Sequence, residues 1–232
     1  MHNLFDNFWQ TITLSLLACY VVFSFAEHQI HRHLMHKKFL PGWVYTKFDQ
    51  LQEIWEAHAV RHHGIWYREF DFETHPEGIH DNIEFRLVDT ATIFILVLPL
   101  NLLFFAASPL AGITFMVMLL VHNYWWNRLH SQMHLPKPVF FANWGLFRWL
   151  ARNHYMHHQM TDKNYNVVLP FADYFLGTQT EPRTRDLREL LRLGYLKPRS
   201  AKTQVRLEKV RNQVAAKRLE IVFAKTQVAV QS

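Results

Sequence analysis

Long apolar runs alternate with polar, histidine-rich stretches along this chain. Residues 8–26 carry no charge, and residues 87–107 and 109–127 form a second apolar block. A helix that crosses a bilayer needs about 20 predominantly apolar residues, so each run is long enough, or nearly so, to span one. The uncharged Ala107-Ser108-Pro109 between the last two runs predicts a tight turn. Residues 87–127 are therefore expected to form a helical hairpin.

Two other features bear on the membrane interpretation. A signal peptide competes for residues 8–26, but no positively charged region precedes that run, so a spanning helix is favoured. Residues 138–152 (PVFFANWGLFRWLAR) are too few and too charged to span, and they predict an interfacial helix or a re-entrant pair. The expected fold is an all-α integral membrane bundle of about three to four spans or re-entrant helices, capped by a cytoplasmic, histidine-rich helical domain. The alternative is a soluble helical protein with buried apolar helices.

The distribution of Lys and Arg predicts how the spans are oriented. The segment before the first run has none, whereas residues 27–86 have seven. Cytoplasmic loops carry an excess of Lys and Arg. A multi-pass protein is therefore expected, with its N-terminus outside and residues 27–86 and 130–232 in the cytoplasm.

The net charge of +6 is unevenly distributed. Residues 181–232 have thirteen Lys and Arg against five Asp and Glu, which gives +8 and leaves −2 for residues 1–180. We expect a membrane-embedded domain over 1–180 and a basic, helical cytoplasmic tail over 181–232, either lying on anionic lipid or solvated. Basic-aromatic modules and zinc-finger spacings are absent, so a nucleic-acid partner is not expected. The single cysteine, Cys19, excludes a disulfide framework within the chain.

Histidine is the most informative residue type in the sequence. Ten of the sixteen histidines form four groups, in the stretches HRHLMH (His31 and His36), HAVRHH, HSQMH and HYMHH. Spacings of three and four residues place imidazoles on one side of a helix, where they can converge on an ion. His31 and His36 are five apart, so one of them is expected at a helix end. The candidate metal ligands are His31, His36, His58, His62, His63, His130, His134, His154, His157 and His158.

The predicted topology brings all four groups to the cytoplasmic face, so one site can be assembled there from every span. Ten neutral imidazoles are too many for one ion, and two metals are implied. Imidazole suits Zn, Cu, Fe and Ni, and residue type alone does not choose among them. Carboxylates that could orient the imidazoles are Glu27, Asp81, Asp162 and Asp173. The other six histidines are treated as non-ligands, with His28 and His80 as reserves.

At these residues the chain resembles a known family. EHQIHRHLMH, residues 27–36, resembles the first histidine box of the fatty acid hydroxylase/sterol desaturase superfamily, and is most similar to the fatty acid 2-hydroxylase branch. The other three groups are similar to the later boxes in order and approximate spacing. The stretch 157–178 resembles the family's closing segment, in which an Asn is followed by an Asp and a Gly-Thr pair. Those residues here are Asn164 or Asn166, Asp173, and Gly177-Thr178.

The resemblance implies an integral membrane, O2-dependent oxygenase with a histidine-rich di-iron centre, in which zinc can replace iron in purified protein. Such enzymes hydroxylate, and less often desaturate, C–H bonds of fatty acyl or sterol lipids, and the ten grouped histidines would be the ligands. No electron-donor domain is fused, so a separate cytochrome- or ferredoxin-type protein would supply electrons. One departure leaves the role of His58 open: three residues separate it from His62, where the family usually has two.

Other classes of protein were weighed against this one. A non-catalytic haem- or metal-binding membrane protein is the alternative from a different class, and a carotenoid hydroxylase is the alternative within the same chemistry. A zinc-dependent membrane hydrolase would need a His-Glu-x-x-His motif, which the sequence lacks.

Overall fold

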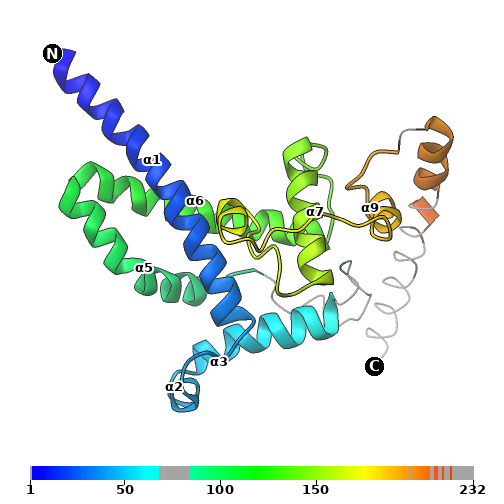
Figure 1. Ribbon diagram of the computed structural model, residues 1–232, viewed down its shortest axis with the longest axis horizontal. Coiled ribbons are helices and arrows are strands. Elements are labelled where there is room, and N and C mark those ends of the chain that lie inside the picture. The colour runs from blue at the N-terminus through cyan, green and yellow to red at the C-terminus, as the bar shows by residue number, and fades with distance from the viewer. Residues whose placement is uncertain are drawn as a thin grey trace. The chain divides into compact units, whose positions relative to one another are not determined.

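The computed structural model is built from helices throughout its described part (Figure 1). It describes residues 2–67, 70, 84–198, 200–209, 212, 213, 216 and 220. The chain divides into two compact units, Met1–Glu181 and Pro182–Ser232. The helices of the first unit are α1 (His2–Ile30), η1 (His31–Met35), α2 (Gly42–Lys47), α3 (Asp49–Trp55), η2 (Glu56–Trp66), α5 (Leu87–Ala107), α6 (Pro109–His134), α7 (Gly145–Gln159) and α8 (Phe171–Phe175).

The predicted hairpin is present as α5 and α6, joined at Ser108 (Figure 1). Pro109 occupies the start of α6, where its fixed φ favours the helix and its missing N–H costs nothing. The two helices approach closely at Gly112, since a Cβ there would meet the Phe105 ring at 2.2 Å. Helix α6 packs against α1, and Val97 of α5 joins a core with Cys19 and Phe23 of α1 and Phe115 and Leu119 of α6.

Two helical segments, Asn7–Met35 and Val88–Ala107, are long and apolar enough to cross a membrane. The span predicted at 109–127 does not reach the same apolar character, so among the described residues these two segments alone qualify. It lies within α6, whose second half carries polar side chains that form hydrogen bonds with neighbouring segments. Asn123 donates to Thr90 of α5, and Asn127 both donates to and accepts from the backbone of Phe85.

The segment 138–152 is not one interfacial helix. Helix α7 begins only at Gly145, and residues 140–143 form a turn ahead of it. From Gly145, α7 runs without interruption to Gln159 and so carries the last histidine group on a regular α-helix.

The second unit contains α9 (Leu187–Leu193), which ends at Gly194 in the left-handed conformation with φ 87°. Glycine adopts this conformation without steric cost, and it commonly terminates helices in this way. Residues 201–209 are also helical. Most of the amphipathic helix predicted further along the tail lies outside the described residues.

Candidate metal centre

The first two histidine groups lie on π-helices, in which hydrogen bonds join residues five apart. In η1 the N–H of His36 donates to the carbonyl of His31 (3.1 Å), and at the end of η2 that of Tyr67 donates to His62 (2.9 Å). Short π-helical segments inside helices are frequent at functional sites. The wider turn places His31 and His36 on one face with their rings stacked, 5.1 Å apart. His36 ends η1, which confirms the expected helix end.

The same geometry accommodates the extra residue in the second group. Because η2 is wider than an α-helix, His58, His62 and His63 share one face although they are four and five residues apart. The rings of His58 and His62 stack at 5.0 Å, and Nε2 of His63 lies 3.2 Å from Nε2 of His58. His58 therefore lies among the other grouped histidines despite its unusual spacing.

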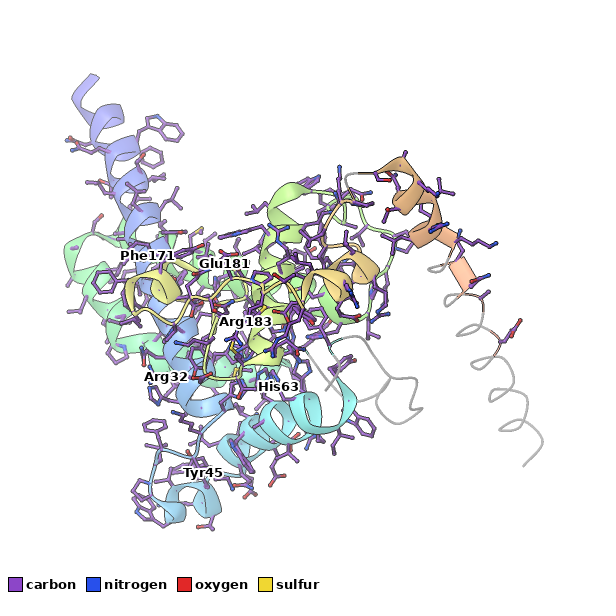
Figure 2. The ribbon with its side chains drawn as sticks, turned by 45° about the vertical axis from the view of Figure 1, so that its right-hand side comes forward. Arg32, Tyr45, His63, Phe171, Glu181 and Arg183 are labelled. Carbon is purple, nitrogen blue, oxygen red and sulfur yellow. The ribbon has the colours of Figure 1, made fainter. Side chains whose placement is uncertain are left out.

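All ten grouped histidines come together inside the first unit. Their ligand atoms form sets in which every atom lies within 4.8 Å of the others. One set comes from η1, η2 and α7, a second from η2, α6 and α7, and a third joins them through η2 and α7; Figure 2 shows His63 on η2. The sets are His31, His36, His58, His63 and His157; His62, His130, His134 and His154; and His62, His63 and His158.

Four backbone carbonyls fix how these imidazoles are oriented. A carbonyl oxygen only accepts, so each imidazole bonded to one carries its proton on Nδ1 and presents the Nε2 lone pair to the cluster. Nδ1 of His134 donates to Phe70 (2.5 Å), that of His157 to Lys163 (2.7 Å) and that of His158 to Tyr67 (3.1 Å). Nδ1 of His31 donates to the carbonyl of Tyr165. Such partners of the second ring nitrogen are typical of metal-binding histidines.

The oriented Nε2 atoms point at one another. Nε2 of His157 lies 2.9 Å from that of His36, Nε2 of His134 lies 3.0 Å from that of His154, and Nε2 of His31 lies 2.7 Å from that of His58. The Nε2 atoms of His31 and His63 both face that of His58, whose single ring proton could satisfy only one of them. A bound cation satisfies all of these lone pairs together, so the residues present fit metal ions.

Burial keeps these imidazoles neutral. It lowers the pKa of His157 to about 4 and that of His36 to about 2, and it lowers the pKa of His58, His62 and His154 well below the usual value. Neighbouring imidazoles add to the effect in the last three. Neutral imidazole is the form that binds a metal, so no proton has to be removed before binding.

The loop after α7 holds one of the orienting carbonyls in place. The carboxylate of Asp173 accepts from the backbone N–H of Tyr165 (2.9 Å) and of Asn166 (2.8 Å), and also from the Thr178 hydroxyl (2.7 Å). Glu27 of α1 accepts from the N–H of Val167 at 2.6 Å. Residues 164–178, where the closing motif lies, thus form a loop fixed by two buried carboxylates.

From the sequence, these carboxylates were candidates for orienting the ligand imidazoles. Glu27 and Asp173 instead lie near His122 (3.7 Å) and His28 (3.6 Å), which belong to none of the three sets. Of the other candidates, the charge of Asp162 raises the pKa of His157 against the larger effect of burial, and Asp81 lies outside the described residues. The groups that orient the imidazoles are backbone carbonyls, which cannot be predicted from residue type.

Within the described part of the chain, the remaining histidines belong to none of the three sets. The ring of His33 packs on Phe39, and His28 bonds the hydroxyl of Thr178 at 2.9 Å. His75, the reserve His80 and the side chain of His2 lie outside the described residues.

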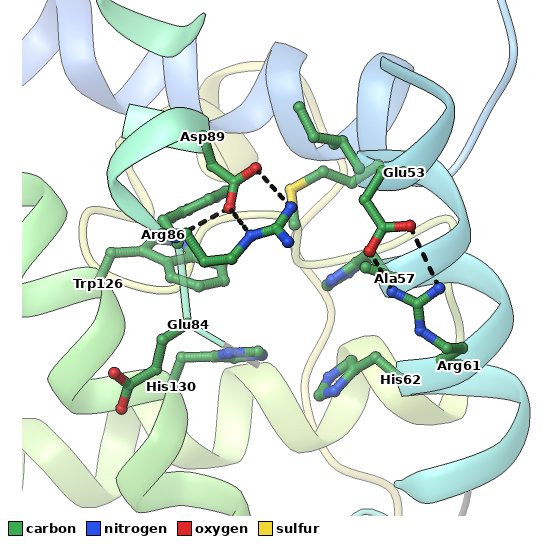
Figure 3. Close-up of a pocket in the computed structure, with 13 residues that line it drawn as sticks. Glu53, Ala57, Arg61, His62, Glu84, Arg86, Asp89, Trp126 and His130 are labelled. Atoms are coloured by element: carbon green, nitrogen blue, oxygen red, sulfur yellow. Dashed lines mark hydrogen bonds and ion pairs between the residues drawn. The ribbon is translucent and has the colours of Figure 1, made fainter. Parts of the chain in front are cut away.

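Two cavities adjoin the histidines. One, of about 50 Å³, is lined by His58, His62 and His130 and by the ion pairs Arg86–Asp89 and Arg61–Glu53 (Figure 3). The other, of about 40 Å³, lies among α1, α5 and α6 and reaches His31. Its lining is mainly apolar and consists of Phe23, Ala26, Glu27, Ile30, His31, Met35, Phe85, Ile93, Val97, Leu119, His122, Asn123 and Trp126.

Comparison with known proteins adds nothing to this geometry, since no family model, curated protein or solved structure matches the chain.

Proposed function

We propose that this chain is a membrane oxygenase that uses O2 to hydroxylate, or less often to desaturate, a C–H bond of a lipid at a histidine-bound di-iron centre. The observation that carries the proposal is the apolar cavity among α1, α5 and α6, which reaches one of the convergent imidazoles, His31. The resemblance of the four histidine boxes and the closing motif to the fatty acid hydroxylase/sterol desaturase superfamily supports the same proposal.

The choice of iron follows from the chemistry required. An unactivated C–H bond is not cleaved by acid–base groups alone, and zinc has no redox chemistry. When bound, a pair of redox-active ions supplies the reduction of O2. The ten histidines would hold the pair, with His62 and His63 each belonging to two of the sets. Electrons would come from a separate cytochrome- or ferredoxin-type protein.

The chain's own part in the reaction is to hold and orient. Four backbone carbonyls fix the imidazoles before any metal binds, which lowers the entropic cost of ordering the site. They belong to Tyr165, Lys163, Phe70 and Tyr67. The apolar cavity among α1, α5 and α6 lies beside His31. Its apolar lining excludes water and suits an acyl chain or sterol ring.

The exposed surface of α5 supports a membrane location. Only 11% of its most apolar window is buried, and a soluble protein rarely exposes so continuous an apolar face. We propose a multi-pass topology in which α1, α5 and the apolar first half of α6 cross the membrane, with the histidine centre and the C-terminus on the cytoplasmic side, following the distribution of Lys and Arg. Large apolar side chains exposed on α5 are Val88, Ile95, Leu96, Leu100, Leu102, Leu103 and Phe105.

The same geometry argues against the haem alternative. Bis-histidine haem places a planar macrocycle between two imidazoles. The facing Nε2 atoms of this cluster lie 2.7–3.2 Å apart, which leaves no space for one.

Expression in a host that lacks the activity tests the proposed function. Lipid mass spectrometry should detect products that gain one oxygen, and the His157→Ala variant should lose them because an imidazole of the first set is missing. The His33→Ala variant, whose ring lies outside the sets, should retain them. Product formation by His157→Ala at the level of the unchanged chain would contradict the site assignment.

The substrate channel is tested by the Ala26→Trp variant. An indole there would fill part of the apolar cavity, and Ala26 belongs to none of the three histidine sets, so bound iron should stay unchanged. Oxidation of long-chain lipids should fall by at least about tenfold relative to shorter ones, since steric misfit of this kind costs about 1–3 kcal/mol or more. Leu17→Trp is the matched control, because Leu17 lies on the exposed side of the same helix. An unchanged chain-length profile in Ala26→Trp would exclude this cavity as the channel.

A further inference from the structure

The loop that follows the last histidine group returns along the candidate membrane helix α1. The hydroxyl of Ser24 donates to the carbonyl of Leu169 and accepts from the N–H of Ala172 (2.8 Å). The side chain of Asn166 donates to the carbonyl of Ser24 (2.8 Å). These bonds place residues 166–172 beside the last turns of the apolar stretch of α1, which contains Ser24.

Helix α8 continues this contact with aromatic rings. Phe171 lies 6.0 Å from the ring of Tyr20 and 6.0 Å from that of Phe25, and Phe175 lies 5.5 Å from that of Phe25. Figure 2 shows Phe171 next to α1. Both Tyr20 and Phe25 belong to the segment long and apolar enough to span a membrane, so α8 lies alongside that segment.

The outer side of α8 is apolar and uncovered in this unit. Phe175 is 70% exposed, Tyr174 52% and Leu176 40%. The only charged residue between positions 167 and 178 is Asp173, which is buried and bonded within the loop.

A second apolar lobe lies just before and at the start of α7, where Phe140, Trp144 and Leu146 are exposed. It is continuous with the loop beside α1, because Trp144, Leu146, Val168 and Leu169 line one cavity of about 230 Å³. Trp125 and Leu129 of α6 line the same cavity.

We propose that α8 and residues 140–146 form a foot that enters the lipid leaflet surrounding α1, and so seat the histidine centre against the membrane. This proposal rests on the membrane location argued above. Lipid is the occupant that the structure favours, because the foot is continuous with the exposed apolar surface of α1, which includes Leu17 and Tyr20. Aromatic rings of this kind are enriched where a protein meets the membrane interface.

The hydrogen bonding of the loop also suits lipid. Non-helical backbone at membrane depth is tolerated only where its polar groups have partners within the protein. Here Ser24, Glu27 and Asp173 bind the backbone N–H groups of Ala172, of residues 167–169, and of Tyr165 and Asn166. Residues 165–172 thus combine an apolar exterior with backbone groups whose partners come from inside the protein.

Spin labelling of the full chain in nanodiscs of phosphatidylcholine and phosphatidylglycerol tests the foot. The lone cysteine is first removed by Cys19→Ala, and nitroxide labels are then attached in Phe175→Cys and, separately, Leu146→Cys. Ile95→Cys on α5 is the lipid reference and Thr161→Cys, an exposed position beyond α7, is the water reference. At both foot positions, collisions with O2 should exceed those with a water-soluble nickel complex, as at Ile95.

Three results would overturn the proposal. In the first, the foot positions behave like Thr161 while Ile95 remains lipid-exposed, so that the foot fails and the membrane location stands. In the second, Ile95 also favours the nickel complex, and the membrane location fails with the foot. In the third, dipolar broadening between labels at Phe175 shows that a second copy of the chain covers the surface. None of these readouts depends on bound iron or on catalysis.

Discussion

The His36→Ala and His154→Ala variants are each expected to lose about one metal ion per chain and all oxygenase activity. His36 belongs only to the first set and His154 only to the second, so each substitution affects one position. Loss of a group that merely orients a ligand typically weakens metal affinity by about 10–100-fold, and loss of the ligand itself should cost more. Metal should be counted by mass spectrometry after a chelator treatment that leaves the unchanged protein loaded.

The His33→Ala variant is the matched control for this pair. Its imidazole comes from the same π-helix as His31, yet it packs on Phe39 outside the sets. It should retain both ions and full activity. Equal metal loss in His33→Ala and His36→Ala would contradict the assignment of ligands.

The second large effect is expected on stability, in the Glu27→Ala variant. This change removes the acceptor for the backbone N–H of Val167 (2.6 Å), Val168 (3.1 Å) and Leu169 (3.4 Å). It also removes a partner of the Asn166 side chain (3.2 Å). A buried donor left without a partner costs about 1–3 kcal/mol, so a loss of at least about 3 kcal/mol is expected in thermal unfolding of the purified protein.

Two further variants make this stability result specific. Glu27→Gln keeps one carbonyl acceptor and should lose less than Glu27→Ala. Glu189→Ala removes a partly exposed pair with Arg192 on α9 and should cost under about 1 kcal/mol. If Glu27→Ala were no more destabilising than Glu189→Ala, the carboxylate would not be holding the loop.

Much of the helical fold could be predicted from local patterns in the sequence. Apolar runs predicted α1 and the α5–α6 hairpin, and Ala107-Ser108-Pro109 marked the turn between them. The third span stays a prediction, since residues 109–127 are less apolar than the two candidate membrane helices. Asn123 and Asn127 reduce the hydropathy of α6, but both find partners in α5 or just before it. The start of α7 was also missed, since the aromatic residues before Gly145 resemble a continuing helix.

The candidate site shows a different limit. Repetition of histidine selected ten side chains that the structure brings into three sets, while their role as metal ligands stays a prediction. His58 lies beside His31 because η2 is a π-helix. Spacing rules for the α-helix assume 3.6 residues per turn, so they do not predict this arrangement. The sequence also could not show which backbone carbonyls orient the imidazoles, because every residue has a carbonyl. Phe70 illustrates this, since its carbonyl reaches His134 from a backbone with φ 75°, unusual for a residue other than glycine.

Quantifying iron in purified, active protein tests the central claim most directly. The account predicts about two iron ions per chain, with the yield of oxidised lipid rising in proportion to bound iron and falling when zinc replaces it. A preparation that oxidises lipid at full rate with no bound iron would contradict it.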